Sequence, residues 1–244
     1  MPQGSVEGRV ALVTGSTRGI GRAVAELLGA EGARVVVHGR RQEDAERVAA
    51  GIPRAVPVSG NVGHLAEVRA ICRTATNLLG PVDVLVNNAG IAPRTAITRV
   101  TDEEWDETIA VDLSAPFWFI RELVPAMKRT GGGCIVNVTS GAGIEGIAGF
   151  SSYAAAKGGI VGLSRTLALE LAMFGIRVNL LSPGADTDML RQLPPELLST
   201  VLDMVPPLED TARAVLELVA DPHVTGRLVR TDEATYTRPA PNDA

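Results

Sequence analysis

The sequence is poor in the residues that support disulfide, metal or nucleic-acid chemistry. Its 244 residues include two cysteines, Cys72 and Cys134, which lie in apolar stretches without a CxxC spacing. We interpret them as buried free thiols. The three histidines, His38, His64 and His223, have no ligand spacing, which argues against a metal site. The net charge of −5 and the lack of a long Lys/Arg run argue against a nucleic-acid partner.

Long apolar runs and aromatic residues are also scarce. No stretch of about 18 uncharged apolar residues is present, so we expect no membrane-spanning helix and no membrane partner. The first residues, MPQGSVEGRVALVTG, lack the basic segment and apolar core of a secretory signal, and we expect a cytoplasmic protein. Aromatic residues make up only 3% of the chain, so Ala, Val, Leu and Ile must build most of the core.

Short β-branched runs alternate with longer helical patterns along the chain. The expected strands are 9–14, 33–39, 54–60, 82–88, 133–140, 176–182 and 226–231. The expected helices are 22–30, 42–50, 64–79, 102–129 with a break near Pro116, 152–174 and 209–220. Continuous Val, Ile and Leu indicate burial on both faces of each strand, and strict alternation with helices indicates parallel pairing.

The predicted fold is therefore α/β. We expect a single doubly wound Rossmann-type domain over residues 1–231, with a seven-stranded parallel sheet and helices on both faces. Residues 232–244 are polar and contain proline, so we predict a C-terminal tail there. Ligands of such sheets bind outside the carboxyl ends of the strands.

A glycine-rich turn follows the first expected strand and opens the first expected helix. Glycines let the backbone approach a pyrophosphate closely, and a helix N-terminus supplies free N–H groups. The cofactor-binding candidates in this turn are Gly15, Ser16, Thr17, Arg18, Gly19, Ile20 and Gly21. The spacing is GxxxGxG rather than GxGxxG, and a tight turn without a ligand is the alternative interpretation.

The second expected strand ends in His38, Gly39, Arg40 and Arg41. Folds that bind the ribose 2′-OH of NAD usually place a carboxylate here, whereas a 2′-phosphate calls for an arginine. Gly39 leaves room, Arg40 offers a guanidinium, and Arg18 adds positive charge. We therefore predict that NADP(H) is preferred over NAD(H). The alternative is that Arg40 and Arg41 are simply solvated at the start of a helix.

Tyr153 and Lys157 lie four residues apart near the start of the longest expected helix, so they share one face. A neighbouring ammonium stabilises a phenolate and lowers the pKa of a tyrosine, which suits it to proton transfer with a carbonyl oxygen. Ser140, at the carboxyl end of the fifth expected strand, is placed to provide a second donor. A YxxxK pair alone is more often structural.

Together these motifs resemble, in order and spacing, those of the short-chain dehydrogenase/reductase family. The matching segments are TGSTRGIG at 14–21, NNAG at 87–90, Ser140, YAAAK at 153–157 and RVNLLSPG at 177–184. The resemblance runs from Val6 to about Gly226. It is nearest to 3-oxoacyl-carrier-protein-reductase-like ketoreductases, which does not fix the substrate.

The resemblance implies a reversible, NADP(H)-dependent reduction of a carbonyl to an alcohol, on a small-molecule substrate that is bulky or carrier-bound. Tyr153 is then the general acid/base, Lys157 holds the nicotinamide ribose, and Ser140 polarises the carbonyl. Besides Tyr153 and Lys157, the further cofactor contacts that it implies are Asn61, Val62, Asn88, Ala89, Gly90, Pro183, Gly184 and Thr187. It also implies a homotetramer or homodimer built partly on the two long helices.

Some positions depart from the family pattern. Asp112 stands where the family usually has an Asn that holds a relay water. Its carboxylate could bind that water, or could weaken the help that Lys157 gives to Tyr153, so we count it as a fourth catalytic candidate. Thr187 lies three residues beyond Gly184 rather than four.

Two other functions stay open from the sequence. The same hydride chemistry serves an epimerase or dehydratase that uses tightly bound NAD(P). A catalytically drifted relative that only binds nucleotide is motivated by Asp112 and by DEA at 232–234, where the family has Asp-Gly-Gly. The apolar Ile144, Ile147 and Phe150 suit either a hydrophobic substrate pocket or ordinary packing.

Overall fold

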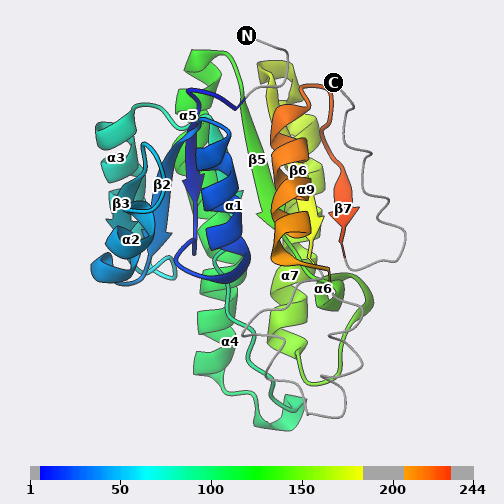
Figure 1. The fold of residues 1–244 in the computed structure, drawn as a ribbon. Helices are drawn as coiled ribbons and strands as arrows, with labels where there is room; N and C mark the ends of the chain where they lie inside the picture. Colours follow the sequence, from blue (N-terminus) through cyan, green and yellow to red (C-terminus); the bar gives the residue numbers. More distant parts are fainter. Residues whose placement is uncertain (1–5, 184–205, 232–244) are drawn as a thin grey trace.

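A computed structural model describes residues 6–183 and 206–231. Seven strands form one parallel sheet in the order β3-β2-β1-β4-β5-β6-β7 (Figure 1). The strands are β1 (Val10–Val13), β2 (Arg34–Gly39), β3 (Val56–Ser59), β4 (Val84–Asn87), β5 (Gly133–Val138), β6 (Ile176–Ser182) and β7 (Leu228–Arg230). The predicted fold class is confirmed, while the predicted tail at 232–244 lies outside the described residues.

Helices cover both faces of the sheet. They are α1 (Gly19–Ala30), α2 (Gln42–Ala49), α3 (Leu65–Leu79), η1 (Ile97–Arg99), α4 (Asp102–Ile109), η2 (Ala110–Ser114), α5 (Ala115–Thr130), α6 (Gly141–Glu145), α7 (Ser151–Leu171), η3 (Ala172–Phe174) and α9 (Leu208–Ala220). Buried side chains of α1, α2 and α9 form one core cluster. Those of α3, α5 and α7 form the other. Each strand is thus sandwiched between aliphatic layers, which explains its continuous apolar sequence.

The register of the sheet aligns the carboxyl ends of the central strands. Val13 of β1 pairs with Val37 of β2 and with Val86 of β4, and Asn87 pairs with Asn137 of β5. The strand order reverses direction at β1 and β4, which is where ligands of such sheets bind. In Figure 1 the strand arrows point to the same end of the molecule, where α6 lies. The motifs of interest follow these ends.

The expected long helix 102–129 is interrupted close to Pro116, as predicted. Its interruption is η2, a π-helical turn, and not Pro116, which lies in the first turn of α5. Ser114 and Ala115 both have right-handed helical backbone, so the chain runs through this point as one helix, and the missing N–H of Pro116 removes one hydrogen bond beside η2. Within η2, Val111 and Asp112 are buried. Such π turns are common at functional sites. The short helices α6 and η1 were not predicted.

Candidate active site

The turn between β1 and α1 requires its glycines. Gly15 has φ +65°, and a Cβ there would lie 2.9 Å from the Cα of Ala89. A Cβ on Gly21 would lie 2.4 Å from Nδ2 of Asn88. Ser16 is fully buried, and its Oγ donates to the carbonyl of Val13 at 2.8 Å. The turn is therefore packed tightly against the residues that follow β4. Because its glycines carry no side chain, its backbone can approach a ligand closely.

The N-terminus of α1 suits a phosphate group. Arg18 is the N-cap residue, but its side chain makes no capping hydrogen bond, and the first turn carries no acidic side chain. The first N–H groups of a helix have no partner within the helix, and together with the helix dipole they attract an anion. This donor set fits the pyrophosphate of a dinucleotide.

The segment after β4 is fastened to this turn. Oγ1 of Thr14 accepts from the N–H groups of Asn88 and Ala89, each at 3.0 Å. Nδ2 of Asn88 donates to the carbonyls of Thr14 and Gly15 at 3.0 and 3.2 Å. The structure thus brings the predicted residues of the glycine turn and of the segment 88–90 together at one edge of the sheet.

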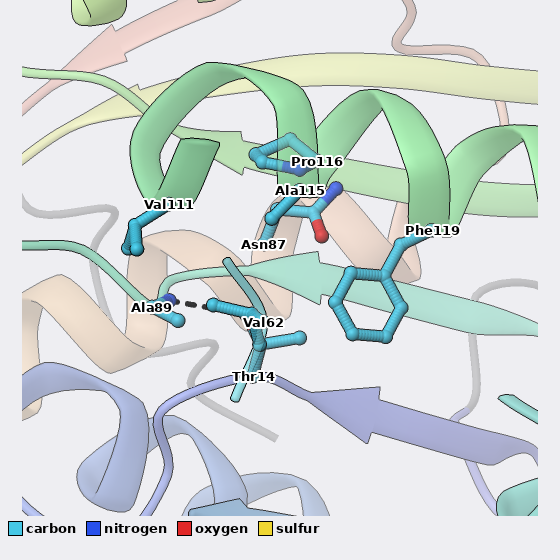
Figure 2. Close-up of a pocket in the computed structure, with 8 residues that line it drawn as sticks. All are labelled: Thr14, Val62, Asn87, Ala89, Val111, Ala115, Pro116 and Phe119. Carbon is cyan, nitrogen blue, oxygen red and sulfur yellow. Dashed lines mark hydrogen bonds between the residues drawn. The ribbon is translucent and has the colours of Figure 1, made fainter. Parts of the chain in front are cut away.

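A small hollow lies beside the contact between Thr14 and Ala89. Figure 2 shows it between Thr14, Val62, Val111 and Phe119, with the Thr14–Ala89 hydrogen bond at its side. It leaves no room for a water molecule. The hollow is therefore a packing gap between layers and has no room for a ligand.

Arg40 and Arg41 differ in their surroundings. Nη2 of Arg41 lies 2.6 Å from Oδ2 of Asp44 in α2, a carboxylate that Arg47 also contacts at 2.8 Å. Arg40 is exposed, and within residues 6–183 and 206–231 it has no hydrogen bond or ion pair. Gly39 is buried, and a Cβ there would lie 2.4 Å from Cγ2 of Thr17. The end of β2 therefore presents one unpaired guanidinium beside the glycine turn.

Tyr153 and Lys157 lie on the buried face of α7, with Asp112 of η2 against the lysine. Nζ of Lys157 lies 3.0 Å from Oδ1 of Asp112, at ion-pair distance without a well-aligned hydrogen bond. It lies 5.6 Å from the centre of the Tyr153 ring and donates to the carbonyl of Val138 at 3.1 Å. All three side chains are less than 7% exposed.

The pKa values of this buried pair follow from its contacts. Burial alone would lower the pKa of Lys157, but the Asp112 carboxylate and Tyr153 outweigh burial, and the pKa is raised. Burial raises the pKa of Asp112, against the ammonium of Lys157 and the N–H of Ile91, which donates to Oδ2 at 3.0 Å. Lys157 is therefore held as a cation beside Tyr153.

Glycine at position 90 makes room for this pair. A Cβ on Gly90 would lie 2.5 Å from Oδ1 of Asp112 and 3.4 Å from Nζ of Lys157. Any larger residue would push the carboxylate away from the ammonium. This gives Gly90 a steric role besides its predicted cofactor contact.

Ser140 is the N-cap of α6, two residues after the end of β5. Its Oγ accepts from the N–H of Ala142 at 3.2 Å, which leaves the hydroxyl proton available for donation. The two preceding residues hold the lysine: Val138 binds Nζ, and Oγ1 of Thr139 donates to the Lys157 carbonyl at 2.9 Å. Ser140 is thereby fixed to the same part of α7 as Tyr153.

The remaining predicted cofactor contacts are partly placed. Asn61 follows β3; its Oδ1 accepts from the N–H of Gly63 at 3.0 Å. Val62 is buried beside it. Pro183 directly follows β6. Gly184 and Thr187 lie outside the described residues.

The fold is the doubly wound α/β type typical of dinucleotide-binding proteins, and comparison with known proteins gives the family. A model of the short chain dehydrogenases matches residues 9–197. The chain is 36% identical to the 3-oxoacyl-[acyl-carrier-protein] reductase FabG of Thermotoga maritima over 239 residues, which cover 93% of this chain and 97% of the relative. It is 40% identical to nodulation protein G of a Rhizobium species, covering 80% and 82% of the two chains.

Solved structures agree with this assignment. A putative short-chain alcohol dehydrogenase from Sinorhizobium meliloti superposes with a TM-score of 0.88 at 30% identity, covering 95% of this chain and 97% of that one. A blue fluorescent protein from a metagenomic library, solved in complex with NADPH, gives 0.87 at 33% identity, with coverages of 93% and 98%. The chain belongs to the short-chain dehydrogenase/reductase family and is an NAD(P)-dependent oxidoreductase.

Other predictions from the sequence have mixed outcomes. Cys72 and Cys134 are buried free thiols, as predicted, and burial raises the pKa of Cys72 to about 12. In the part of the chain that the structure describes, no helix is long and apolar enough to cross a membrane, and no group of His, Cys, Asp and Glu is arranged to hold a metal. The cytoplasmic location stays a prediction.

Sequence reasoning missed two residues that shape this site. Thr14 fastens the segment 88–90, and its hydroxyl at a strand end was the available signal. His38 is 2% exposed; the N–H of Gly15 donates to its Nδ1 at 3.1 Å, and its Nε2 lies 3.1 Å from the carbonyl of Gly60. A histidine in the apolar run VVVHG must satisfy its ring nitrogens inside the protein, which was the signal there.

The buried imidazole predicts an acid-sensitive fold. Burial lowers the pKa of His38 to about 4, whereas an unfolded histidine titrates near 6.5. Between these two pH values the imidazole of the unfolded chain is protonated, whereas that of the folded chain stays neutral. We expect the free energy of unfolding to fall by up to about 3 kcal/mol as pH drops from about 6.5 to about 4. Urea denaturation of wild type and His38→Asn across this range checks it, and parallel stability curves would contradict it.

Proposed function

We propose that the chain is an NADP(H)-dependent reductase that converts a carbonyl to an alcohol reversibly, with Tyr153 as general acid/base. The observation that carries the proposal is the arrangement of Lys157, which is buried beside the Tyr153 ring and tied to the strand end that leads into Ser140. A positive charge held at that place serves to stabilise a phenolate. The bound nicotinamide supplies the hydride.

Each side chain of the site has a separate role in the remaining chemistry. In the reducing direction the hydroxyl of Tyr153 donates its proton to the carbonyl oxygen, and in oxidation the phenolate takes it back. Ser140 donates a hydrogen bond to the same oxygen, because its Oγ already accepts from Ala142 and its proton is free. Lys157 stabilises the phenolate, and its Nζ, held by the carbonyl of Val138 and the carboxylate of Asp112, has one further N–H for the nicotinamide ribose. Asp112 holds the lysine in place.

Cofactor preference follows from the end of β2. Arg40 is exposed and unpaired among the described residues, whereas Arg41 is committed to Asp44. A guanidinium gives a 2′-phosphate a charged, planar partner. Arg40, with Arg18 at the start of α1, supports NADP(H) over NAD(H), and the similar structure solved with NADPH is consistent with this choice.

The substrate class that we propose is a 3-oxoacyl thioester. Relatives at 36% identity are named as reductases of 3-oxoacyl groups on acyl-carrier protein. Ile144 in α6 and Ile147 after it are 38% and 53% exposed, which favours an apolar wall near Ser140 over ordinary packing. An acetoacetyl thioester with NADPH tests the proposal: we expect a 3-hydroxyacyl product. A cofactor that binds without reducing any ketone would favour the epimerase or dehydratase alternative.

Asp112→Asn is expected to shift the pH dependence of the reaction. The Asp112 carboxylate raises the pKa of Lys157 against the effect of burial, so its removal should lower the pKa of Lys157. The alkaline limb of the profile of kcat/KM against pH for alcohol oxidation, where the Lys157 ammonium is lost, should then move toward lower pH. Loss of the countercharge to buried Lys157 should also destabilise the fold by about 3–5 kcal/mol.

The control for this variant is Asp102→Asn, at the exposed start of α4. It removes the same charge from the chain without touching Lys157. An Asp112→Asn profile that is unchanged, or that moves toward higher pH, contradicts the role of the ion pair.

We propose a homodimer or homotetramer that uses the outer faces of α4, α5 and α7. Leu169 and Met173 are 84% and 82% exposed, and Trp105 and Phe117 are exposed on neighbouring helices. Exposed apolar side chains of this size are typical of subunit contacts. Light scattering should give a multiple of 25.5 kDa for wild type and a smaller assembly for Leu169→Glu. A monomeric wild type contradicts this proposal.

A further inference from the structure

The side chain of His38 touches two loops of the cofactor site at once. The backbone N–H of Gly15 donates to Nδ1, and Nε2 lies against the carbonyl of Gly60, each at 3.1 Å. A backbone N–H is always a donor and a carbonyl always an acceptor. The imidazole is therefore neutral, with its proton on Nε2.

The backbone around His38 reinforces this connection. The N–H of Ser16 donates to the carbonyl of His38 at 2.8 Å, and the N–H of His38 donates to Oγ of Ser16 at 2.9 Å. Two successive residues of the glycine turn, Gly15 and Ser16, are thus held by one residue of β2. The position of Gly15 depends on the imidazole, because its N–H has the ring nitrogen as acceptor.

Three segments that would contact the cofactor begin close to His38. The turn that begins at Gly15 faces the pyrophosphate, Arg40 lies two residues beyond His38, and Asn61 directly follows Gly60. We infer that His38 is a positioning residue of the NADP(H) site, which holds the pyrophosphate turn through Nδ1, while the contact of Nε2 with the Gly60 carbonyl orients the ring. This inference rests on the proposed function.

A role in stability alone makes a different prediction from a positioning role. If the imidazole only satisfies buried groups, its loss lowers stability and leaves the affinity of the folded protein unchanged. If it positions the turn, its loss raises the Kd and KM for NADPH, while kcat at saturating NADPH and the KM for the carbonyl substrate stay the same. The two roles are therefore separable by binding measured well below the unfolding temperature.

Three substitutions dissect the two hydrogen bonds. In His38→Asn, Oδ1 takes the place of Nδ1 and still accepts from Gly15. In His38→Gln, the terminal amide reaches Gly60 as a donor but leaves Gly15 without its acceptor. His38→Leu removes both contacts. We expect the Kd for NADPH to rise about 5- to 100-fold in His38→Leu, to rise less in His38→Gln, and to stay within about 3-fold of wild type in His38→Asn.

Val36→Ala is the matched control, because Val36 is a fully buried residue of the same strand whose truncation weakens the core without touching the turn. NADPH titrations of all five proteins, followed by nicotinamide fluorescence with thermal unfolding in parallel, give the test. Failure of wild type to bind NADPH overturns the proposed function, and the inference with it. If wild type binds, an unchanged Kd in folded His38→Leu, or a change equal to that of Val36→Ala, overturns the inference alone. Should His38→Leu not fold, equal affinities of the Asn and Gln variants overturn it, and tighter binding by Asn supports it.

Discussion

Tyr153→Phe is expected to lower kcat by about 100- to 10 000-fold while the Kd for NADPH stays unchanged. The substitution removes the proton donor and little else. The ring would keep its edge-on contact with Phe150, whose centre lies 6.1 Å away, and its place beside Lys157. Because the phenol is buried and water has no ready access to replace it, we expect no rescue by solvent at neutral pH. Steady-state reduction of an acetoacetyl thioester, with NADPH binding measured separately, checks both parts.

Thr166→Val is the control for this variant. Thr166 lies on the exposed face of the same helix, and its hydroxyl contacts only the carbonyl of Gly162 among the described residues. It loses one hydroxyl from α7, as Tyr153→Phe does, and should keep wild-type kcat. A Tyr153→Phe enzyme that retains more than about a tenth of the wild-type kcat would show that another group supplies the proton.

Arg40→Asp is expected to reverse the cofactor preference. The Kd for NADPH should rise by about 10- to 100-fold, because a charge-assisted contact to the 2′-phosphate is lost and a carboxylate repels that phosphate. The Kd for NADH should stay the same or fall, since the new carboxylate can accept from the ribose 2′-OH. Fluorescence titrations with both reduced cofactors measure the ratio of the two constants.

The neighbouring Arg41→Ala tests whether general positive charge explains the effect. Its guanidinium is already paired with Asp44, so its loss should change the Kd for NADPH by less than about 3-fold. If the Arg40 and Arg41 variants weaken NADPH binding equally, the preference for NADPH comes from the general positive charge of this surface and not from a specific contact of Arg40.

Much of the fold could be predicted because its signals are local. The run VALV in β1 is apolar throughout, VLVN in β4 is apolar up to its final Asn87, and each is followed by a helical pattern. Buried parallel strands require this composition, so the class of fold and the edge that carries the site follow from the sequence. The strand ends were predicted within a few residues for the same reason.

The parts that were missed depend on contacts between distant segments. Nothing in AVDLS marks a π-helical turn at η2, because that turn forms where the chain packs against α7 and turns Asp112 toward Lys157. The pairing of His38 with Gly15 and Gly60 arises from the register of three strands. Family resemblance named Tyr153, Lys157 and Ser140, but only the structure shows that Arg41 is paired while Arg40 is not.

The central claim is that this chain binds NADP(H) at the open edge of the sheet and prefers it to NAD(H). The most direct test is an equilibrium titration of purified wild-type protein with NADPH and, separately, with NADH, following nicotinamide fluorescence. We predict saturable binding of both, with the Kd for NADPH at least about 10-fold lower. Equal constants would contradict the role assigned to Arg40, and no binding of either cofactor would contradict the proposed function as a whole.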